Sequence, residues 1–327
     1  MNSTTRRALL GAGLAAPAVI AAPARAQGAW PQRPIRLIVP FAAGTSTDIV
    51  GRLIGQHLSR GLDGHVVVVE NRAGAGGTIG AAAVAQAAPD GHTLLLGVIG
   101  THAVNPHLMR GLTYDPARDF TPILAHSKTK ILLVVPPSLG ARNLADFLAL
   151  ARQRTMNIGS AGTGTTGHLN QALLANLSGI PMNHVPYRDG GQAVTDLVSG
   201  RLDGMFYHTQ FVRPHVQQGT MMALGITGTE RSNLMPQVPS FAEGGFPGIA
   251  AEGWWAMFGP ARMPEPIVTR VNRILNEALR DQATLSVLNN SGIEPIGGTP
   301  EELSRFQQEE FQRWGEVIRR ADIRVDS

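Results

Sequence analysis

The sequence predicts an α/β protein of two Rossmann-like domains with a hinge and an interdomain cleft. Short apolar runs alternate with amphipathic helical stretches, and this order is typical of parallel sheets covered by helices. The alternation restarts near residue 131, and the 327 residues are enough for two domains. The tail after residue 258 has helical patterns but almost no strands, so we expect it to pack on the first unit.

The first unit begins at the apolar run 35–40, which predicts a buried strand. In the helix expected over 47–60, the apolar side chains recur along one face. A second strand is predicted at 65–70, and the helix at 78–88 ends at a Pro-Asp-Gly turn. The apolar run 93–98 completes the order strand, helix, strand, helix, strand, which indicates a parallel sheet.

The second unit begins with an apolar strand at 131–136. A helix is predicted over 142–152, with Ser138 or Asn143 as its possible cap. Further strands are expected at 156–160, 182–186, 203–207 and 221–227, and further helices at 166–178 and 190–199.

In the tail, residues 253–260 are expected to be extended, followed by helices at 264–281 and 301–320. A tail that packs back on the first unit makes the chain cross twice between the domains, which creates the hinge and the cleft. The expected boundaries are 27–130 plus 256–327 for the discontinuous first domain and 131–255 for the second.

The N-terminus resembles an export signal. It has arginines at 6 and 7, an apolar run over 8–22 and an Ala-Arg-Ala cleavage pattern at 24–26. We expect a cleaved signal peptide over residues 1–26 and an exported mature protein. The paired arginines fit twin-arginine export, but ordinary secretion is equally open. An uncleaved amphipathic N-terminus is the alternative.

Charge and cysteine content exclude several classes of protein. Removal of the three arginines within residues 1–26 leaves 25 basic against 24 acidic residues, which argues against a nucleic-acid partner. The chain has no cysteine, so neither a disulfide framework nor a lipidated cysteine is expected.

Two loops share one pattern. "PFAAGTSTD" at 40–48 and "SAGTGTTGH" at 160–168 each join a predicted strand to a helix through Gly, Ser and Thr. Thr47 and Asp48 could cap the first helix, and Thr165 or Thr166 the second. Helix N-termini present unpaired N–H groups and a partial positive charge, so such loops bind anions without Lys or Arg. Phosphate, carboxylate and nucleotide all fit this pattern.

Other chemical motifs are weak. The glycine-rich segment 69–80 resembles a dinucleotide fingerprint, but Ile79 stands where the third glycine is required. Hydrolase and metalloprotease motifs are absent, and the histidines, such as His102 and His168, lack metal-ligand spacing. We therefore expect no catalytic residue, no metal and no cofactor.

Six ordered blocks resemble the Bug family, the periplasmic solute receptors of tripartite tricarboxylate transporters. The resemblance runs from about residue 30 to the C-terminus. The blocks are "RPIRLIVPFAAGTSTD", "VVVENRAGAGGTIG", "APDGHTLLLG", "NPHLMRGLTYDPARDFTPI", "HVPYRDGGQAVTDLVSGRLDGMF" and "RSNLMPQVPSFAEGGFPG".

The resemblance implies a fold like that of type II periplasmic binding proteins and a cleft that closes on one small carboxylate. The binding residues implied in the first domain are Phe41, Ala42, Ala43, Gly44, Thr45, Thr47 and Asp48. Those implied in the second are Ser160, Gly162, Thr165 and His168, with Tyr187 and Asp203 nearby. Thr101, His102, Tyr207 and His208 lie where substrates are distinguished.

The chain departs from the family pattern near these positions. Thr45 stands where a second glycine is usual, Asp189 replaces a glycine, and Gln192 replaces a frequent proline. Arg188 replaces the common lysine, and Tyr207 a small or acidic residue. These departures put the ligand's identity in question, not the fold.

The leading hypothesis is a monomeric periplasmic receptor that delivers a mono- or dicarboxylate to a membrane permease. Tyr207 raises the prospect of an aromatic ligand. A ligand-sensing receptor for a two-component system is the alternative. A periplasmic enzyme that uses His168 or Asp48 with a nucleotide or phosphorylated substrate ranks third.

Overall fold

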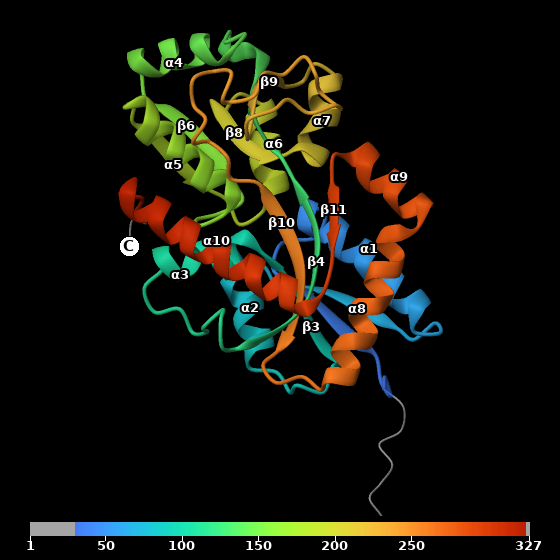
Figure 1. Cartoon of the computed structure of the whole chain (residues 1–327). Helices are drawn as coiled ribbons and strands as arrows, with labels where there is room; N and C mark the ends of the chain where they lie inside the picture. The colour runs from blue at the N-terminus through green and yellow to red at the C-terminus, as the bar shows by residue number, and fades with distance from the viewer. Residues whose placement is uncertain (1–29, 325–327) are drawn as a thin grey trace, which may run out of the picture.

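The computed structural model describes residues 30–324. The expected signal peptide at 1–26 lies outside this range. Figure 1 shows two α/β lobes, one above the other, with the long strands β4 (Phe120–Thr129) and β10 (Gly253–Pro260) running between them. Within the described residues, no helix is long and apolar enough to cross a membrane.

The lower lobe contains a six-stranded mixed sheet in the order β11-β4-β10-β3-β1-β2. Strands β1 (Ile35–Val39), β2 (Val67–Asn71) and β3 (Thr93–Val98) are parallel, as the sequence predicts. β10 pairs antiparallel with β3 and β4, and β11 (Glu294–Gly297) antiparallel with β4. The tail therefore completes the first sheet, and β10 enters it at Gly253.

The upper lobe contains a five-stranded sheet in the order β7-β6-β8-β5-β9. Its strands are β5 (Ile131–Val135), β6 (Met156–Ser160), β7 (Met182–Pro186), β8 (Gly204–His208) and β9 (Met222–Ile226). β6 pairs parallel with β7 and β8, whereas β5 pairs antiparallel with β8 and β9. The order strand, helix, strand predicted the parallel pairs but not the reversed strand.

Helices cover both sheets. In the lower lobe they are α1 (Ser46–Gly61), η1 (Ala75–Gly77), α2 (Thr78–Ala85), η2 (Gly100–Val104), α3 (Asn105–Leu108), α8 (Glu265–Arg280), α9 (Gln282–Ser291) and α10 (Pro300–Arg320). In the upper lobe they are η3 (Pro137–Leu139), α4 (Leu144–Gln153), α5 (Thr166–Ser178), α6 (Gly190–Val198) and α7 (Thr209–Gln217).

Several elements are not predicted from the sequence, among them β4, α7, α9 and β11. β4 lacks a clear apolar run, because His126, Ser127 and Lys128 follow its apolar part, yet it pairs on both sides. α7 is polar and contains Pro214, which argues against a helix on propensity alone. Of the two possible caps of α4, Asn143 is the one used, and it accepts from the Asp146 amide.

The C-terminal helix α10 links the lobes. Glu310 on α10 accepts hydrogen bonds from the indole N–H of Trp254 at 3.0 Å and of Trp314 at 2.9 Å, which fixes the helix against β10. Beyond the helix end, the Ala321 carbonyl accepts from the side-chain amide of Asn176 on α5. Figure 1 shows α10 running diagonally from the lower lobe toward α5.

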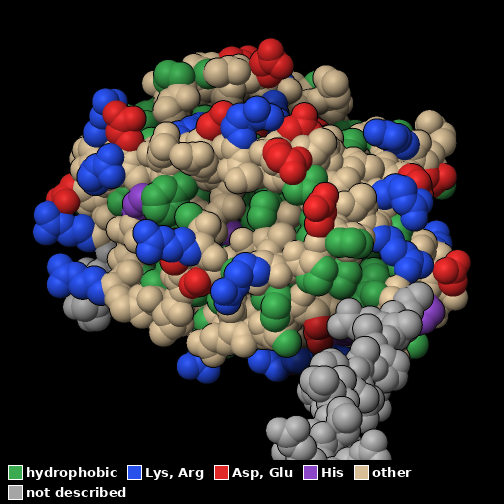
Figure 2. Space-filling model, turned by 60° about the horizontal axis from the view of Figure 1, so that its bottom comes forward, with side chains coloured by type: hydrophobic (Ala, Val, Ile, Leu, Met, Phe, Trp, Pro, Cys, Tyr) green, Lys and Arg blue, Asp and Glu red, His purple; other side chains and the backbone are tan. Residues whose placement is uncertain are grey.

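The surface carries mixed charge. Figure 2 shows Lys and Arg side chains interspersed with Asp and Glu over the visible face. Ion pairs such as Arg33–Asp90 and Arg231–Glu243 are largely exposed, so each contributes little to stability.

Candidate functional site

The first loop ends in a tight turn at the start of α1. Thr45 is the N-cap, and its hydroxyl donates to the Ala42 carbonyl at 2.7 Å. The same oxygen accepts from the Asp48 amide at 3.4 Å. The cap is therefore Thr45, not Thr47 or Asp48 as the sequence suggested. Its φ of −77° is ordinary for threonine, so the departure from glycine causes no backbone strain.

The second loop repeats this turn at the start of α5. Thr165 is the N-cap, with φ of −80°, and its hydroxyl donates to the Gly162 carbonyl at 2.7 Å. Its amide also bonds to that carbonyl, as the Thr45 amide does to Ala42. Thr165 makes no side-chain capping bond to the helix. The two loops thus have the same turn geometry.

Asp48 fixes the conformation of the first loop through hydrogen bonds. Its carboxylate accepts from the Gly44 amide at 2.9 Å, from Arg52 at 2.9 Å and from the Asn71 side chain at 2.8 Å. Burial raises the pKa of this carboxyl, but the bonds from Arg52, Gly44 and Asn71 outweigh that effect and hold the pKa below its usual value. Asp48 positions the loop and has no place in the cavity lining.

His168 takes the place of Asp48 in the second loop. Its Nδ1 accepts from the Gly164 amide at 3.2 Å, so the proton of the neutral ring is on Nε2. The ring stacks on His184 with centroids 4.1 Å apart. Burial lowers the pKa of His168 to about 4, so the ring is neutral near pH 7 and keeps its role as acceptor.

The first turns of both helices leave backbone donors unpaired. Within residues 30–324, no protein acceptor bonds the amides of Ser46 and Thr47 on α1 or of Thr166 and Gly167 on α5. The Ser46 hydroxyl oxygen is buried, and within residues 30–324 it makes no hydrogen bond of good geometry, although it lies close enough to Tyr207 to lower the pKa of that phenol. Unpaired donors at two helix N-termini form an anion-binding arrangement.

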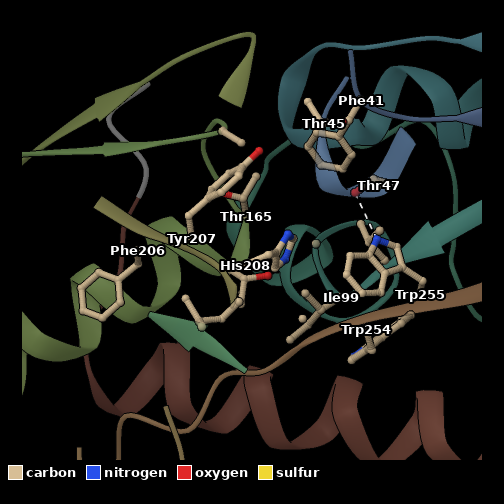
Figure 3. Close-up of a pocket in the computed structure, with 17 residues that line it drawn as sticks. Phe41, Thr45, Thr47, Ile99, Thr165, Phe206, Tyr207, His208, Trp254 and Trp255 are labelled. Atoms are coloured by element: carbon tan, nitrogen blue, oxygen red, sulfur yellow. Dashed lines mark hydrogen bonds between the residues drawn. The ribbon is translucent and has the colours of Figure 1, made fainter. Parts of the chain in front are cut away.

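These donors border a small cavity of about 40 Å³ between the lobes. Its lining comes from both sheets and both loops. The lining residues are Phe41, Thr45, Thr47, Val98, Ile99, Gly100, Ile131, Ala161, Thr165, Thr166, Gly167, Phe206, Tyr207, His208, Gly253, Trp254 and Trp255. Figure 3 shows Thr45 and Thr47 on one side and Thr165 and Tyr207 on the other.

Three rings stand next to the hydroxyl groups. The His208 ring lies 5.5 Å from Tyr207 and 5.1 Å from Trp255, measured between centroids. Trp255 donates its indole N–H to the Thr47 hydroxyl at 3.1 Å (Figure 3), which leaves the proton of that hydroxyl available to a ligand. By contrast, Phe206 points away from the cavity in Figure 3, and Trp254 bonds Glu310.

The glycine-rich segment 74–77 belongs to the contact between the lobes. A Cβ on Gly76, where φ is +60°, would lie 2.2 Å from the Thr163 carbonyl oxygen of the second loop. The Asn105 side chain donates to the Gly76 carbonyl at 3.1 Å and lies against Gly164. These glycines allow close approach of two backbones, which accounts for the incomplete nucleotide fingerprint.

Six of the predicted site residues line the cavity, and the rest lie outside the lining. Those that line it are Phe41, Thr45, Thr47, Thr165, Tyr207 and His208. Asp48, His168, Ser160, Gly162, Ala42, Ala43 and Gly44 instead build the two loops. Ser160, for example, bonds His184 at 2.7 Å and the Gly162 carbonyl at 3.0 Å.

Four other predicted residues point elsewhere. Asp203 pairs with Arg154 at 2.6 Å at the start of β8, and Tyr187 donates to Asp196 at 2.9 Å. His102 is buried and stacks on Phe258 at 3.9 Å. The Thr101 hydroxyl is occupied by the backbone of β3 and by His102. We therefore omit these side chains from the ligand contacts.

Sequence reasoning missed much of the apolar lining. Val98, Ile99 and Ile131 come from strand ends whose sequence is typical of ordinary core, and Trp255 lies in the segment 253–260, for which the sequence predicts only an extended backbone. The paired tryptophans at the start of β10 were the available signal. No charged side chain occurs among the described residues that line the cavity, and residues 30–324 contain no cluster of metal ligands.

The fold and the cavity define a two-lobed solute-binding protein. An R. palustris protein solved with adipate is 34% identical, with a TM-score of 0.87 over 90% of this chain and 99% of that chain. MatC from Rhodopseudomonas palustris, solved with bound malate, is 34% identical, with a TM-score of 0.84 over 88% and 99%. The fold class predicted from the sequence is thereby confirmed.

The chain belongs to the tripartite tricarboxylate transporter receptor family, which matches residues 50–323. Protein BugT of Bordetella pertussis is 35% identical over 99% of this chain and 100% of its own length. The resemblance to the Bug family is confirmed, and so is the expectation of a binding protein rather than an enzyme.

Proposed function

We propose that this protein is a periplasmic receptor that captures a small carboxylate between its lobes and delivers it to a tripartite tricarboxylate-type membrane transporter. One observation carries the proposal: two helix N-termini with unpaired amides border the same cavity, and none of the described residues that line it has a charged side chain. The family is named for transporter receptors, and two similar proteins were solved with adipate and malate.

The ligand carboxylate takes its hydrogen bonds from the amides of Thr47, Thr166 and Gly167 and from the Thr47 hydroxyl. The hydroxyls of Thr45 and Thr165 donate to their own loops, so they shape the site without donating to the ligand. Hydrogen bonds to a charged group contribute about 1.5–3 kcal/mol each. Four of them, less the ordering costs, approach the roughly 8 kcal/mol of a micromolar complex.

We take the domains to be residues 27–130 plus 256–327 and residues 131–255. Rotation of one domain against the other about the hinge opens and closes the cleft. The carboxylate bridges both loops only when the lobes are closed, so it favours the closed state. Export through the signal peptide at residues 1–26 would place the receptor in the periplasm, beside the permease. Relatives described as a periplasmic transporter and a periplasmic binding protein support this placement.

Titration calorimetry with a panel of carboxylates tests the proposal on protein purified without refolding. We expect micromolar or tighter binding of at least one carboxylate and no turnover. Native mass spectrometry of the same sample would reveal a retained ligand by its mass. A folded protein that binds no carboxylate would refute the receptor function.

The variant Thr47→Val tests the binding mode. It removes the hydroxyl whose proton is available to the ligand, and we expect affinity to fall by about tenfold or more. Thr195→Val is the matched control, because its hydroxyl donates to the Gly191 carbonyl on the exposed face of α6. Equal affinities of the two variants would contradict the proposed contacts.

A further inference from the structure

The cavity has one polar end and an apolar remainder. The polar end consists of the first turns of α1 and α5. The remainder is lined by Val98, Ile99, Ile131 and Ala161, with the rings of Phe41, Tyr207 and Trp255 around it. The Trp255 N–H and the Thr47 oxygen already bond each other, so they do not form a second strong polar site.

The positive potential of the site matches a single negative charge. Each helix N-terminus is equivalent to about half a unit charge, so α1 and α5 together balance about one carboxylate. No Lys or Arg occurs among the described residues that line the cavity. The cations beside the first loop and the interdomain strands are paired elsewhere: Arg52 with Asp48, and Lys128 with Glu252 and Glu294.

We propose, on the basis of the receptor function above, that the site selects a monocarboxylate with a flat apolar body and discriminates against dicarboxylates. The carboxylate sits at the two helix N-termini, and the apolar body lies among Phe41, Tyr207 and Trp255. The substrate class is therefore an aromatic or short aliphatic monocarboxylic acid.

Among the described residues that line the cavity, His208 is the one titratable side chain besides Tyr207 that could meet a second polar group of the ligand. Its Nδ1 is buried and has no hydrogen-bond partner in the described part of the chain, and its other nitrogen lies over Gly253. Burial lowers the pKa of His208 to about 4, so the neutral ring offers one hydrogen bond and no charge. A hydroxyl group on the ligand fits this position, whereas a second carboxylate would lose its hydration without a cation to replace it.

Arg188 is a cation outside the cavity that could bind the second carboxylate of a dicarboxylate ligand. It lies on the exposed loop after β7, outside the cavity lining. A dicarboxylate long enough to reach the mouth of the cavity could place its second carboxylate near this loop. The variant Arg188→Gln separates the cases, because it leaves the affinity for a monocarboxylate unchanged if the ligand stays within the cavity.

Matched acid pairs test the proposal by titration calorimetry near neutral pH. Benzoate is compared with terephthalate, and hexanoate with adipate, so that each pair differs by one carboxylate. We expect the monocarboxylate of at least one pair to bind about tenfold tighter or more. Tighter binding of the dicarboxylate in both pairs would overturn the inference and leave the receptor function intact. A dicarboxylate that binds the wild type as tightly as its monocarboxylate partner, and loses that affinity in Arg188→Gln, would overturn the inference in the same way. Failure of all four acids and of the wider panel would refute the receptor function itself.

Two charge-adding variants test the cause of the discrimination. His208→Arg places a cation in the cavity, and Phe41→Lys places one at a half-buried wall position that tolerates change more readily. We expect either folded variant to bind the dicarboxylate of a pair about tenfold tighter than the wild type does. If both variants keep the wild-type melting temperature and neither gains dicarboxylate affinity, missing charge is not the cause, and the inference fails.

Discussion

Gly76 offers a direct way to separate lobe closure from folding. Its backbone has φ of +60°, and an added Cβ would lie 2.2 Å from the Thr163 carbonyl oxygen on the opposite lobe, whereas ordinary contact begins at 3.4 Å. The variant Gly76→Ala must therefore move the loops apart by more than 1 Å, given those two distances. The moving atom is a backbone carbonyl, so no flexible side chain can relieve the clash.

The expected loss follows from the cost of overpacking. Forcing one extra methyl group into a packed contact costs about 1–3 kcal/mol. In the hinge motion proposed above, the cost falls on the closed state alone, so we expect the closed population and the apparent affinity to drop by about 5- to 150-fold. The left-handed backbone conformation adds about 1–2 kcal/mol to the cost of alanine, and this part affects folding in both states.

Gly179→Ala is the matched control. Gly179 ends α5 with φ of 66°, close to that of Gly76, and a Cβ there meets nothing within 4 Å. Both variants should lose similar stability in urea denaturation, while only Gly76→Ala should lose affinity in calorimetry. Wild-type affinity in Gly76→Ala would refute the closure of the lobes at this contact.

Three further predictions concern the loops and the scaffold. Asp48→Ala should weaken ligand binding about tenfold and lower the free energy of unfolding by about 1–2 kcal/mol, because the loop loses three hydrogen bonds while Arg52 stays solvated; unchanged affinity would reduce the loop to a helix cap. Burial lowers the pKa of His168 to about 4, so this histidine binds a proton more readily in the unfolded chain than in the folded protein. The free energy of unfolding should therefore rise from about pH 4 to pH 6.5 and then level off. In His168→Gln this rise should be smaller by roughly 3 kcal/mol when unfolding is measured across that pH range. Glu310→Ala should cost about 3 kcal/mol in urea denaturation because two indole N–H groups lose their acceptor, whereas Glu310→Gln, which keeps one acceptor oxygen, should cost less.

The two loops could be found from the sequence because their chemistry is local. Glycine and threonine between an apolar run and an amphipathic run specify a turn and a helix start, and the structure has this arrangement at both 40–48 and 160–168. The exact cap, Thr45, depends on a bond to Ala42 three residues earlier. Sequence reasoning placed the cap two or three residues too late, at Thr47 or Asp48, because Ser, Thr and Asp are all good caps.

The orientation of side chains beyond the loops could not be read from the sequence. Tyr207 and Phe206 are neighbours on β8, and strand pairing alone decides which of them faces the cavity. His102 was expected to contact substrate, but Phe258 covers it from a strand far along the chain. Contacts of this kind depend on how β10 inserts between β3 and β4, which no local pattern specifies.

The equivalent roles of Asp48 in the first loop and His168 in the second could be recognised only from the structure. A carboxylate and a neutral imidazole can both accept a hydrogen bond, and each of these two accepts one from the glycine amide four residues earlier. The family resemblance implies ligand contacts for both residues, which are the last residues of the two loops. In the structure their hydrogen bonds hold the loops in shape.

A structure of the protein with a bound monocarboxylate such as benzoate tests the central claim most directly. The proposal predicts that the carboxylate oxygens lie within hydrogen-bonding distance of the Thr47 amide on α1 and the Gly167 amide on α5, with the ring beside Tyr207 and Trp255. A carboxylate bound at only one helix, or outside the cavity, would contradict the claim that the two loops close on a single anion.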